Sequence, residues 1–247
     1  MKAPALLATV LLCLPSRFAA ADTEWLVAPY GWLPTVSVDQ TFDDGSGGGS
    51  SGGGAEVLSK IDFAAMLRAE MARGHWGAML DYIFVSLADQ TTYSPLPAIN
   101  IDIEGDLDLE VLELGGFYRL SGEARGLDLM LGLRRIDVDL GIVINRQEQS
   151  PQPLQIAAEI NDAFVGARYL LPFGERWNFT LRGDYGFGDS DGTLNAIASI
   201  GVRFNETFGM NFGYRHANIE FEEDIEGSRE DTDISLSGPF VGLMFRF

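Results

Sequence analysis

Apolar and polar residues alternate along most of the chain, and this period of two predicts β-strands with one apolar face. The alternation is strictest over residues 177–188, where one register holds Trp177, Phe179, Leu181, Gly183, Tyr185 and Phe187. It is equally clear at the end of the chain, where Arg246 lies opposite a face made of Pro239, Val241, Leu243, Phe245 and Phe247. We expect the apolar face of each strand to contact hydrocarbon and the other face to contact a wetter space.

Ten segments carry this pattern. They lie at about residues 24–38, 64–73, 76–84, 99–120, 127–142, 165–171, 177–188, 194–204, 208–215 and 237–247. Short turns at 74–75, 121–126, 172–176 and 205–207 alternate with polar connections at 43–54, 88–97, 145–155, 189–192 and 220–233, most of which are longer. The sequence therefore predicts an all-β fold, an antiparallel up-and-down transmembrane β-barrel of ten strands.

Two segments leave eight or twelve strands open as alternatives. Residues 55–72 also fit an amphipathic helix, because Leu58, Ile61, Ala65 and Ala69 follow a period of 3.6. In 99–120 the apolar register changes near Val111, which a β-bulge or an extension beyond the bilayer would explain. A soluble β-sandwich would also alternate, but its outer face would be polar and its connections would not be sorted by length.

Aromatic residues gather near the short turns, where we expect them to form one interfacial girdle. These residues are Trp76, Tyr118, Tyr169, Trp177, Phe204, Phe208 and Phe247.

The first segment has its apolar residues in one register, and we expect this face to be the outer one. Its members are Leu26, Ala28, Tyr30, Trp32, Val36 and Val38.

The first 21 residues have the pattern of a secretory signal peptide. Lys2 precedes an apolar run over 3–14, and Ala19-Ala20-Ala21 forms a small-residue cleavage site before Asp22. Cys13 is the only cysteine and would leave with this segment, so no disulfide or thiol chemistry is expected. The predicted domains are a signal peptide at 1–21 and a barrel at 22–247, with a flexible Gly/Ser loop at 43–54.

The formal charge of −19 becomes −21 when the two positive charges of Lys2 and Arg17 are removed with the signal peptide. This acidity argues against nucleic acid as a partner. No later segment has 18 consecutive apolar residues, which excludes spanning helices and is consistent with a closed barrel. We expect a monomer in the outer membrane, with lipid, lipopolysaccharide and the barrel-assembly machinery as its partners.

Several motifs resemble a group of uncharacterised Gram-negative outer-membrane β-barrel proteins, which are porin-like small barrels. They are Ala28–Pro34, Asn161–Tyr169, Arg176-Trp177, Leu181–Asp184, Gly213–Arg215, Ser237–Pro239 and Phe245–Phe247. The resemblance covers most of the chain after the signal peptide, but not the Gly/Ser tract. It implies the fold and the outer-membrane location, and no agreed activity. The terminal Val241, Leu243, Phe245 and Phe247 resemble the signal that the assembly machinery recognises.

The charged residues of the other register are the candidate site, because they would point into the barrel. They are Arg68, Glu70, Asp81, Glu113, Arg119, Arg134, Arg168, Arg182, Asp184, Arg203, Arg215 and Arg246. One interpretation is a packed network in which arginines neutralise carboxylates and fill the lumen. The other is a narrow water-filled pore that favours anions.

Chemistry beyond this network has little support in the sequence. Only His75 and His216 could act as catalytic bases, and neither has a nucleophile beside it in the sequence. We therefore predict no enzyme, no metal and no cofactor, with a barrel hydrolase acting on lipid or peptide as the alternative. The acidic residues between Glu220 and Asp233 favour a solvated loop, and a cation-, lipopolysaccharide-binding or adhesive surface is a further alternative.

Overall fold

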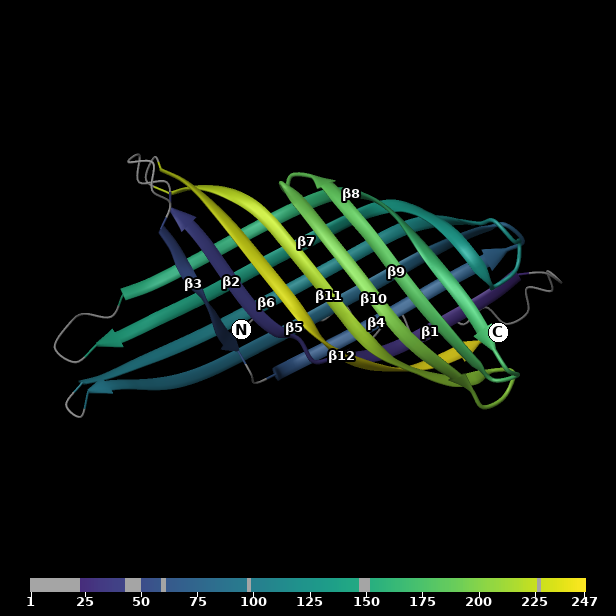
Figure 1. The fold of residues 1–247 in the computed structure, drawn as a ribbon, viewed down its shortest axis with the longest axis horizontal. Helices are drawn as coiled ribbons and strands as arrows, with labels where there is room; N and C mark the ends of the chain where they lie inside the picture. Colours follow the sequence, from purple (N-terminus) through teal and green to yellow (C-terminus); the bar gives the residue numbers. More distant parts are fainter. Residues whose placement is uncertain (1–22, 43–49, 59–60, 97–98, 147–151, 226–227) are drawn as a thin grey trace, which may run out of the picture.

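The alternating segments form strands. The computed structural model describes residues 23–42, 50–58, 61–96, 99–146, 152–225 and 228–247 (Figure 1). Within these residues every regular element is a β-strand, and none is a helix that could cross a membrane. The strands are β1 (Thr23–Trp32), β2 (Thr35–Phe42), β3 (Ser50–Leu58), β4 (Ile61–Arg73), β5 (Trp76–Leu96), β6 (Ile99–Arg119), β7 (Gly126–Arg146), β8 (Gln152–Phe173), β9 (Trp177–Gly188), β10 (Gly192–Arg203), β11 (Phe208–Ile225) and β12 (Ser228–Arg246).

The strands close into an antiparallel barrel of ten strands, as the sequence predicts. β1 and β2 belong to one barrel strand that is interrupted at Leu33-Pro34, and β3 and β4 belong to the next. From β4 to β12 each strand pairs with its neighbour in the sequence. β12 closes the barrel, because it pairs with β1 near the C-terminus and with β2 farther along. No helix occurs at 61–72, so the helical interpretation of that segment is wrong.

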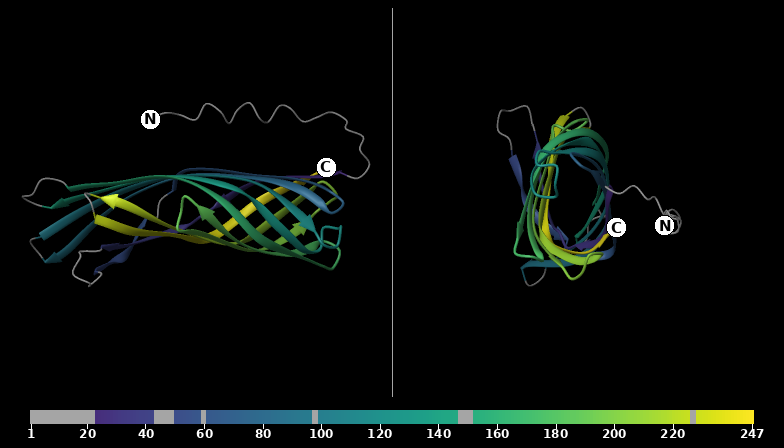
Figure 2. Two further views of the ribbon diagram at one scale, coloured as in Figure 1. Left: turned by 90° about the horizontal axis from the view of Figure 1, so that it is seen from above. Right: turned by 90° about the vertical axis from the view of Figure 1, so that its right-hand side faces the viewer.

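The two ends of the barrel differ in shape. We call the end with Thr23, the C-terminus and the short turns the turn end, and the opposite end the extension (Figures 1 and 2). β5, β6 and β7 have 21 residues each and β8 has 22, whereas β9 and β10 have 12. The long strands therefore project beyond the β9–β10 hairpin as two facing groups, β5–β8 and β11-β12-β2-β3 (Figure 1).

An apolar belt surrounds the barrel next to the turn end. Leu131 and Leu133 of β7 are 64% and 65% exposed. Arg134, the next residue along the strand, is buried inside the barrel. The other exposed members include Trp76, Leu112, Leu114, Leu127, Leu129, Val165, Leu181, Tyr185, Phe212, Tyr214 and Val241. Large apolar side chains exposed around the whole circumference are typical of a barrel that crosses a bilayer.

Aromatic rings line the turn-end edge of this belt. Trp76 packs edge-on against Tyr118, and Phe173 stacks on Trp177. Of the predicted girdle, Trp76, Tyr118, Tyr169, Trp177, Phe204 and Phe247 are exposed and Phe208 is partly exposed. This arrangement is the one expected of an interfacial girdle.

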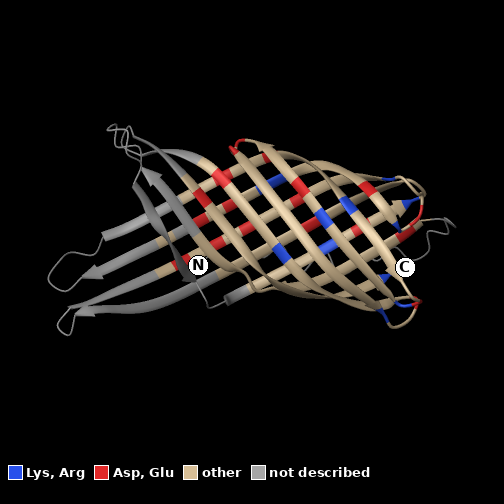
Figure 3. Ribbon diagram, viewed as in Figure 1, with Lys and Arg blue, Asp and Glu red and all other residues tan. Residues whose placement is uncertain are grey.

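The polarity of the two faces is inverted in the extension. Leu107, Leu109 and Val111 of β6 are buried inside, and Asp106 and Asp108 point outward. The ladders from β6 to β5 and to β7 have no register shift between Ile101 and Arg119, so a bulge is not the cause. The strand simply continues beyond the belt, where water rather than hydrocarbon contacts the outer face. Figure 3 shows charged residues, most of them acidic, along this part of the barrel.

The inversion also explains why long loops were a wrong prediction. Most of 88–97 lies in β5, and most of 145–155 lies in β7 and β8. The acidic segment 220–233 is mainly paired backbone, from Glu220 opposite Asp233 to Ile225 opposite Ser228. The backbone of these segments remains paired because the neighbouring strands are equally long.

The first segment presents the opposite face from the one we expected. Trp32 and Val36 are buried in the interior, and Tyr30 reaches Asp81 inside the barrel. Trp25 and Leu33 are exposed on the outer face instead. The predicted signal peptide lies outside the described residues, as does 43–49 of the predicted Gly/Ser loop, whereas 50–54 begin β3.

Candidate functional site in the barrel interior

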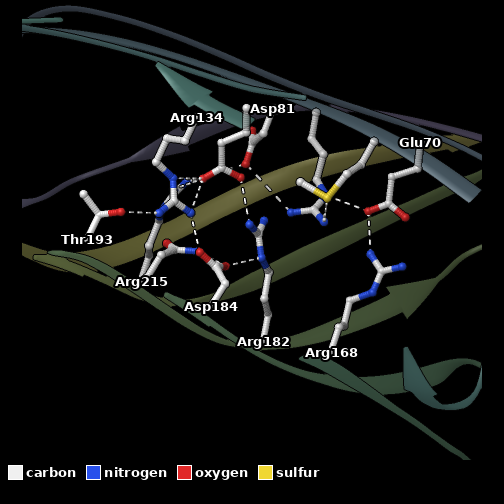
Figure 4. Close-up of polar contacts among 12 residues, drawn as sticks. Glu70, Asp81, Arg134, Arg168, Arg182, Asp184, Thr193 and Arg215 are labelled. Carbon is white, nitrogen blue, oxygen red and sulfur yellow. Dashed lines mark hydrogen bonds and ion pairs between the residues drawn. The ribbon is translucent and has the colours of Figure 1, made fainter. Parts of the chain in front are cut away.

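Glu113 is the centre of an ion-pair network that crosses the barrel. Its carboxylate is fully buried and accepts hydrogen bonds from Arg134 Nε at 3.0 Å and Arg182 Nη2 at 2.8 Å. Arg215 Nη2 lies 3.5 Å from Glu113 Oε1. These residues come from β6, β7, β9 and β11, so the network links strands on different sides of the barrel (Figure 4).

Asp184 is the second acceptor of this network. It forms ion pairs with Arg134 and with Arg182 Nε, the latter at 2.7 Å. Asn195 Nδ2 donates at 2.8 Å to Asp184 Oδ2, the oxygen that also pairs with Arg182 Nε. Arg134 Nη1 donates to Thr193 Oγ1 at 3.1 Å (Figure 4). The planar guanidinium group of each arginine carries several N–H donors in a fixed arrangement, so it can pair with more than one carboxylate.

A second group of pairs lies nearer the turn end. Arg168 bridges Glu70 at 2.6 Å and Asp128 at 2.8 Å, and Arg68 donates to Glu70 at 2.7 Å. The guanidinium of Arg168 also lies 4.7 Å from the ring centroid of Phe117. The buried aromatic ring therefore adds a cation–π contact to the ion pairs.

Asp81 connects the two groups to β1. Tyr30 donates to it at 2.9 Å, Arg215 Nη1 lies at 3.6 Å and Arg68 Nη1 at 3.8 Å. The combined network has five arginines and five carboxylates: Arg68, Arg134, Arg168, Arg182, Arg215, Glu70, Asp81, Glu113, Asp128 and Asp184. Its formal charges cancel, which is the condition under which buried ions are tolerated.

An apolar cluster closes the barrel on the extension side of the network. Trp32 packs there under the guanidinium of Arg215, which lies 5.2 Å from its ring centroid. The cluster also contains Ile83, Val85, Leu107, Leu109, Val111, Ile136, Val138, Ile160, Ile219, Phe221, Ile234 and Leu236. A void of about 20 Å³ between the network and the cluster has room for only about one water molecule.

A much larger cavity lies on the turn-end side of the network. This vestibule has a volume of about 600 Å³ and is lined by Arg119, Arg203 and Arg246 as well as by residues of the network. Arg119 donates to Glu24 at 2.9 Å, and Arg203 donates to the carbonyl of Glu175 at 2.7 Å. The barrel thus contains a vestibule, an ion-pair layer and an apolar layer in succession.

Most of the predicted site residues meet in this interior. Ten of the twelve are buried or nearly so, whereas Arg203 is exposed at the rim and Arg246 is partly exposed. Prediction missed Asp128, Tyr30, Thr193 and Asn195. Asp128 lies in the inward register of the 127–133 alternation and could have been found from it. Tyr30 was missed because the first segment was assigned the wrong face.

A histidine–serine pair lies outside this network. His216 of β11 is directly opposite Ser237 of β12, and its Nδ1 lies 2.6 Å from Ser237 Oγ. It shares its register with Tyr214, which is exposed on the belt. His75, in the turn after β4, lies 2.6 Å from the carbonyl of Arg119 and stacks on Tyr118. Ser237 is 21 residues from His216 in the sequence, which is why local sequence inspection did not find the pair.

The described part of the chain holds no group of three or more His, Cys, Asp or Glu residues suited to a metal ion.

No protein-family model matches the chain, and no curated protein matches it. Among solved structures, the outer membrane protease OmpT from Escherichia coli aligns with 92% of this chain and 98% of its own. That alignment has a TM-score of 0.55 and 10% identity. The chain has the fold of the outer-membrane β-barrels.

Two other solved structures align over similar shares of the chain. The translocator domain of the autotransporter NalP from Neisseria meningitidis has a TM-score of 0.42 and 11% identity, and covers 92% of this chain and 88% of its own. Ail, the attachment invasion locus protein of Yersinia pestis, has a TM-score of 0.32 and 10% identity, with coverages of 92% and 99%. At these scores and identities neither structure says anything about function.

Proposed function

We propose that the protein is an integral outer-membrane barrel of a Gram-negative envelope, closed to solutes and structural in role. The apolar belt supports insertion in a bilayer, and the fold supports the outer membrane as that bilayer. With Thr23, the C-terminus and the short turns at the turn end, this end would face the periplasm and the extension would face the exterior. Lipid, lipopolysaccharide and the barrel-assembly machinery are the partners that this location implies.

The single observation that carries the proposal is the pair of layers that fill the interior. Ions would have to pass a charge-neutral layer of paired arginines and carboxylates and then an apolar layer. The space between them is about 20 Å³, against about 600 Å³ in the vestibule. Small barrels whose interiors are filled by side chains in this way do not leave a channel.

We expect the purified protein to be electrically silent in planar lipid bilayers. The reason is that, in the part of the barrel that the structure describes, the ion-pair layer and the apolar layer lie between the vestibule and the extension. Single-channel recording at several salt concentrations tests this, with a heat-modifiable gel shift as the control for folding. Stable anion-selective steps from the folded protein would contradict the closed barrel and favour the pore.

A second function is supported by the pair of His216 and Ser237. A serine hydroxyl within hydrogen-bonding distance of an imidazole is the arrangement of an activated nucleophile. The neighbouring Asn218 of the same face is held by Asp233 at 2.7 Å and Ser235 at 3.0 Å. The pair lies where the belt gives way to the extension, so its substrate would be an acyl ester of a membrane lipid. In this alternative the barrel is a hydrolase.

Covalent labelling separates the two functions. If Ser237 is an activated nucleophile, a fluorophosphonate probe will label the folded protein, and labelling will disappear in Ser237→Ala and fall sharply in His216→Ala. Ser235→Ala is the matched control, because Ser235 lies on the same strand and face without a histidine opposite. For the structural role we expect no labelling and no release of fatty acid from vesicles. Labelling that Ser237→Ala removes would establish the hydrolase instead.

A further inference from the structure

We propose that the vestibule binds a small organic anion, with one phosphate or carboxylate group on a compact apolar body, which enters from the turn end. The proposal concerns only the cavity below the ion-pair layer. It is independent of conduction, because a blind cavity can bind a ligand that it does not transmit.

The charge of the vestibule is the first reason. Its lining contains seven arginines and four acidic residues, in a chain whose formal charge is −19. The deeper arginines are neutralised within the network, and Arg119 is paired with Glu24, an exposed residue. Within the described residues neither Arg203 nor Arg246 has a carboxylate within 4.0 Å. These two guanidinium groups without an ion pair line the cavity together with Glu24 and Glu206, and an entering anion would meet them there.

Unpaired donors are the second reason. The Nη1 atoms of Arg182 and Arg246 are buried and have no hydrogen-bond partner among the described residues. Arg182 is only 2% exposed, and both arginines line the vestibule. Buried polar atoms are nearly always paired, so such donors indicate a missing acceptor. A phosphate or carboxylate oxygen of a ligand would be such an acceptor for Arg182 or for Arg246.

The backbone beside Arg246 leaves room for this guanidinium. Gly209 of β11 lies between Arg203 of β10 and Met244 of β12 in the sheet. A Cβ atom at Gly209 would be 2.6 Å from the carbonyl oxygen of Val202 and 3.4 Å from Arg246 Nη1. The absence of a side chain thus lets Arg246 extend across β11. Arg203 is near enough that its charge acts unfavourably on that of Arg246, and an anion between them would relieve this repulsion.

The remaining lining defines the body of the ligand. Leu26, Ala28, Ile197, Phe240 and Met244 provide apolar surface beside the arginines. The volume of about 600 Å³ lies within the range of small-molecule sites. A single aromatic ring or a short acyl chain with an acidic group combines these properties, whereas inorganic phosphate would use only the charge.

The experiment is isothermal titration calorimetry of the full-length folded protein in a neutral maltoside detergent. The probes are phenyl phosphate and benzoate, with inorganic phosphate and phenol as comparators. We expect both acidic aromatic probes to bind in one-to-one stoichiometry, inorganic phosphate to bind more weakly, and phenol not to bind. Arg246→Gln should weaken the binding of phenyl phosphate by about tenfold, because one charge-assisted contact is lost.

A second variant keeps the test decisive if Arg246→Gln does not fold. Arg203 is exposed at the rim, so Arg203→Glu should fold and weaken phenyl phosphate by about fivefold through charge reversal. Arg135→Glu is the matched control. Arg135 is exposed on the outer surface of β7, and its substitution changes the net charge by the same amount. Absence of binding to the wild-type protein would overturn the proposal. Equal effects of Arg203→Glu and Arg135→Glu would also overturn it.

Discussion

Glu113→Ala is expected to destabilise the barrel by roughly 3–5 kcal/mol, the cost of removing one partner from a buried ion pair. Glu113 is fully buried and contacts Arg134, Arg182 and Arg215. Without it the network has five arginines and four carboxylates, and one positive charge is left without compensation in the interior. Asp184 can still pair with Arg134 and Arg182, but it cannot neutralise both.

Equilibrium unfolding in urea, measured in lipid vesicles by tryptophan fluorescence, tests this effect. Glu159→Ala is the matched control, because Glu159 pairs with Arg135 on the exposed surface and its loss should cost less than about 1 kcal/mol. Glu113→Gln should fall between the two, since the amide keeps one acceptor oxygen. Equal stabilities of Glu113→Ala and Glu159→Ala would mean that water compensates the arginines and that the layer is not sealed.

The lipid-facing half of the barrel could be predicted because hydrocarbon imposes a simple rule. Every outward residue of 127–133 must be apolar, so the alternation of Leu127, Leu129, Leu131 and Leu133 assigns the two faces without any knowledge of the fold. The inward direction of Arg134 and Arg182 follows directly. The short turn at Gly74-His75 was equally predictable from its sequence, and Gly74 has the positive φ of 57° that such a turn requires.

The extension could not be predicted by the same rule, because outside the bilayer the rule reverses. Apolar Leu109 and Ile136 lie inside and acidic Asp108 and Asp137 lie outside, as in a soluble sandwich. A period of two fixes which residues share a face and not which face is the inner one. The first segment shows the same limit. Trp32 and Val36 belong to the inner apolar cluster, and Leu26 and Ala28 line the vestibule, so its apolar register is the inner one along its length.

The partners of the arginines were a further limit. Arg168 is 98 residues from Glu70, and Arg182 is 69 residues from Glu113. Such pairs depend on the closure of the barrel and on its strand registers, which no local pattern encodes. Sequence could name most members of the network. Only the three-dimensional arrangement shows that their charges cancel and that, among the described residues, Arg203 and Arg246 have no ion-pair partner at the vestibule.

Gly238→Ala is expected to prevent closure of the barrel. Gly238 is buried in β12 at the point where this strand changes its partner from β1 to β2. A Cβ atom there would overlap the carbonyl oxygen of Leu33 and would lie 2.9 Å from Pro34 Cα. Both obstacles are backbone atoms. The backbone N–H of Leu33 also donates a hydrogen bond to the carbonyl oxygen of Pro239, the residue after Gly238, at 3.0 Å. The added methyl group therefore cannot be accommodated by a side-chain rotation, and the two strands must separate.

Refolding from urea into detergent, scored by the heat-modifiable gel shift, measures this effect. Gly183→Ala is the matched control, because Gly183 is an exposed strand glycine on β9 and a Cβ atom there would contact nothing within 4 Å. Its side chain should be tolerated or should stabilise the barrel by up to about 1 kcal/mol. We expect Gly183→Ala to refold fully and Gly238→Ala to give little or no shifted band. If Gly238→Ala refolds as well as Gly183→Ala, the contact of β12 with Leu33-Pro34 is not what seals the barrel, and closure must depend on the pairing of β12 with β1 nearer the C-terminus.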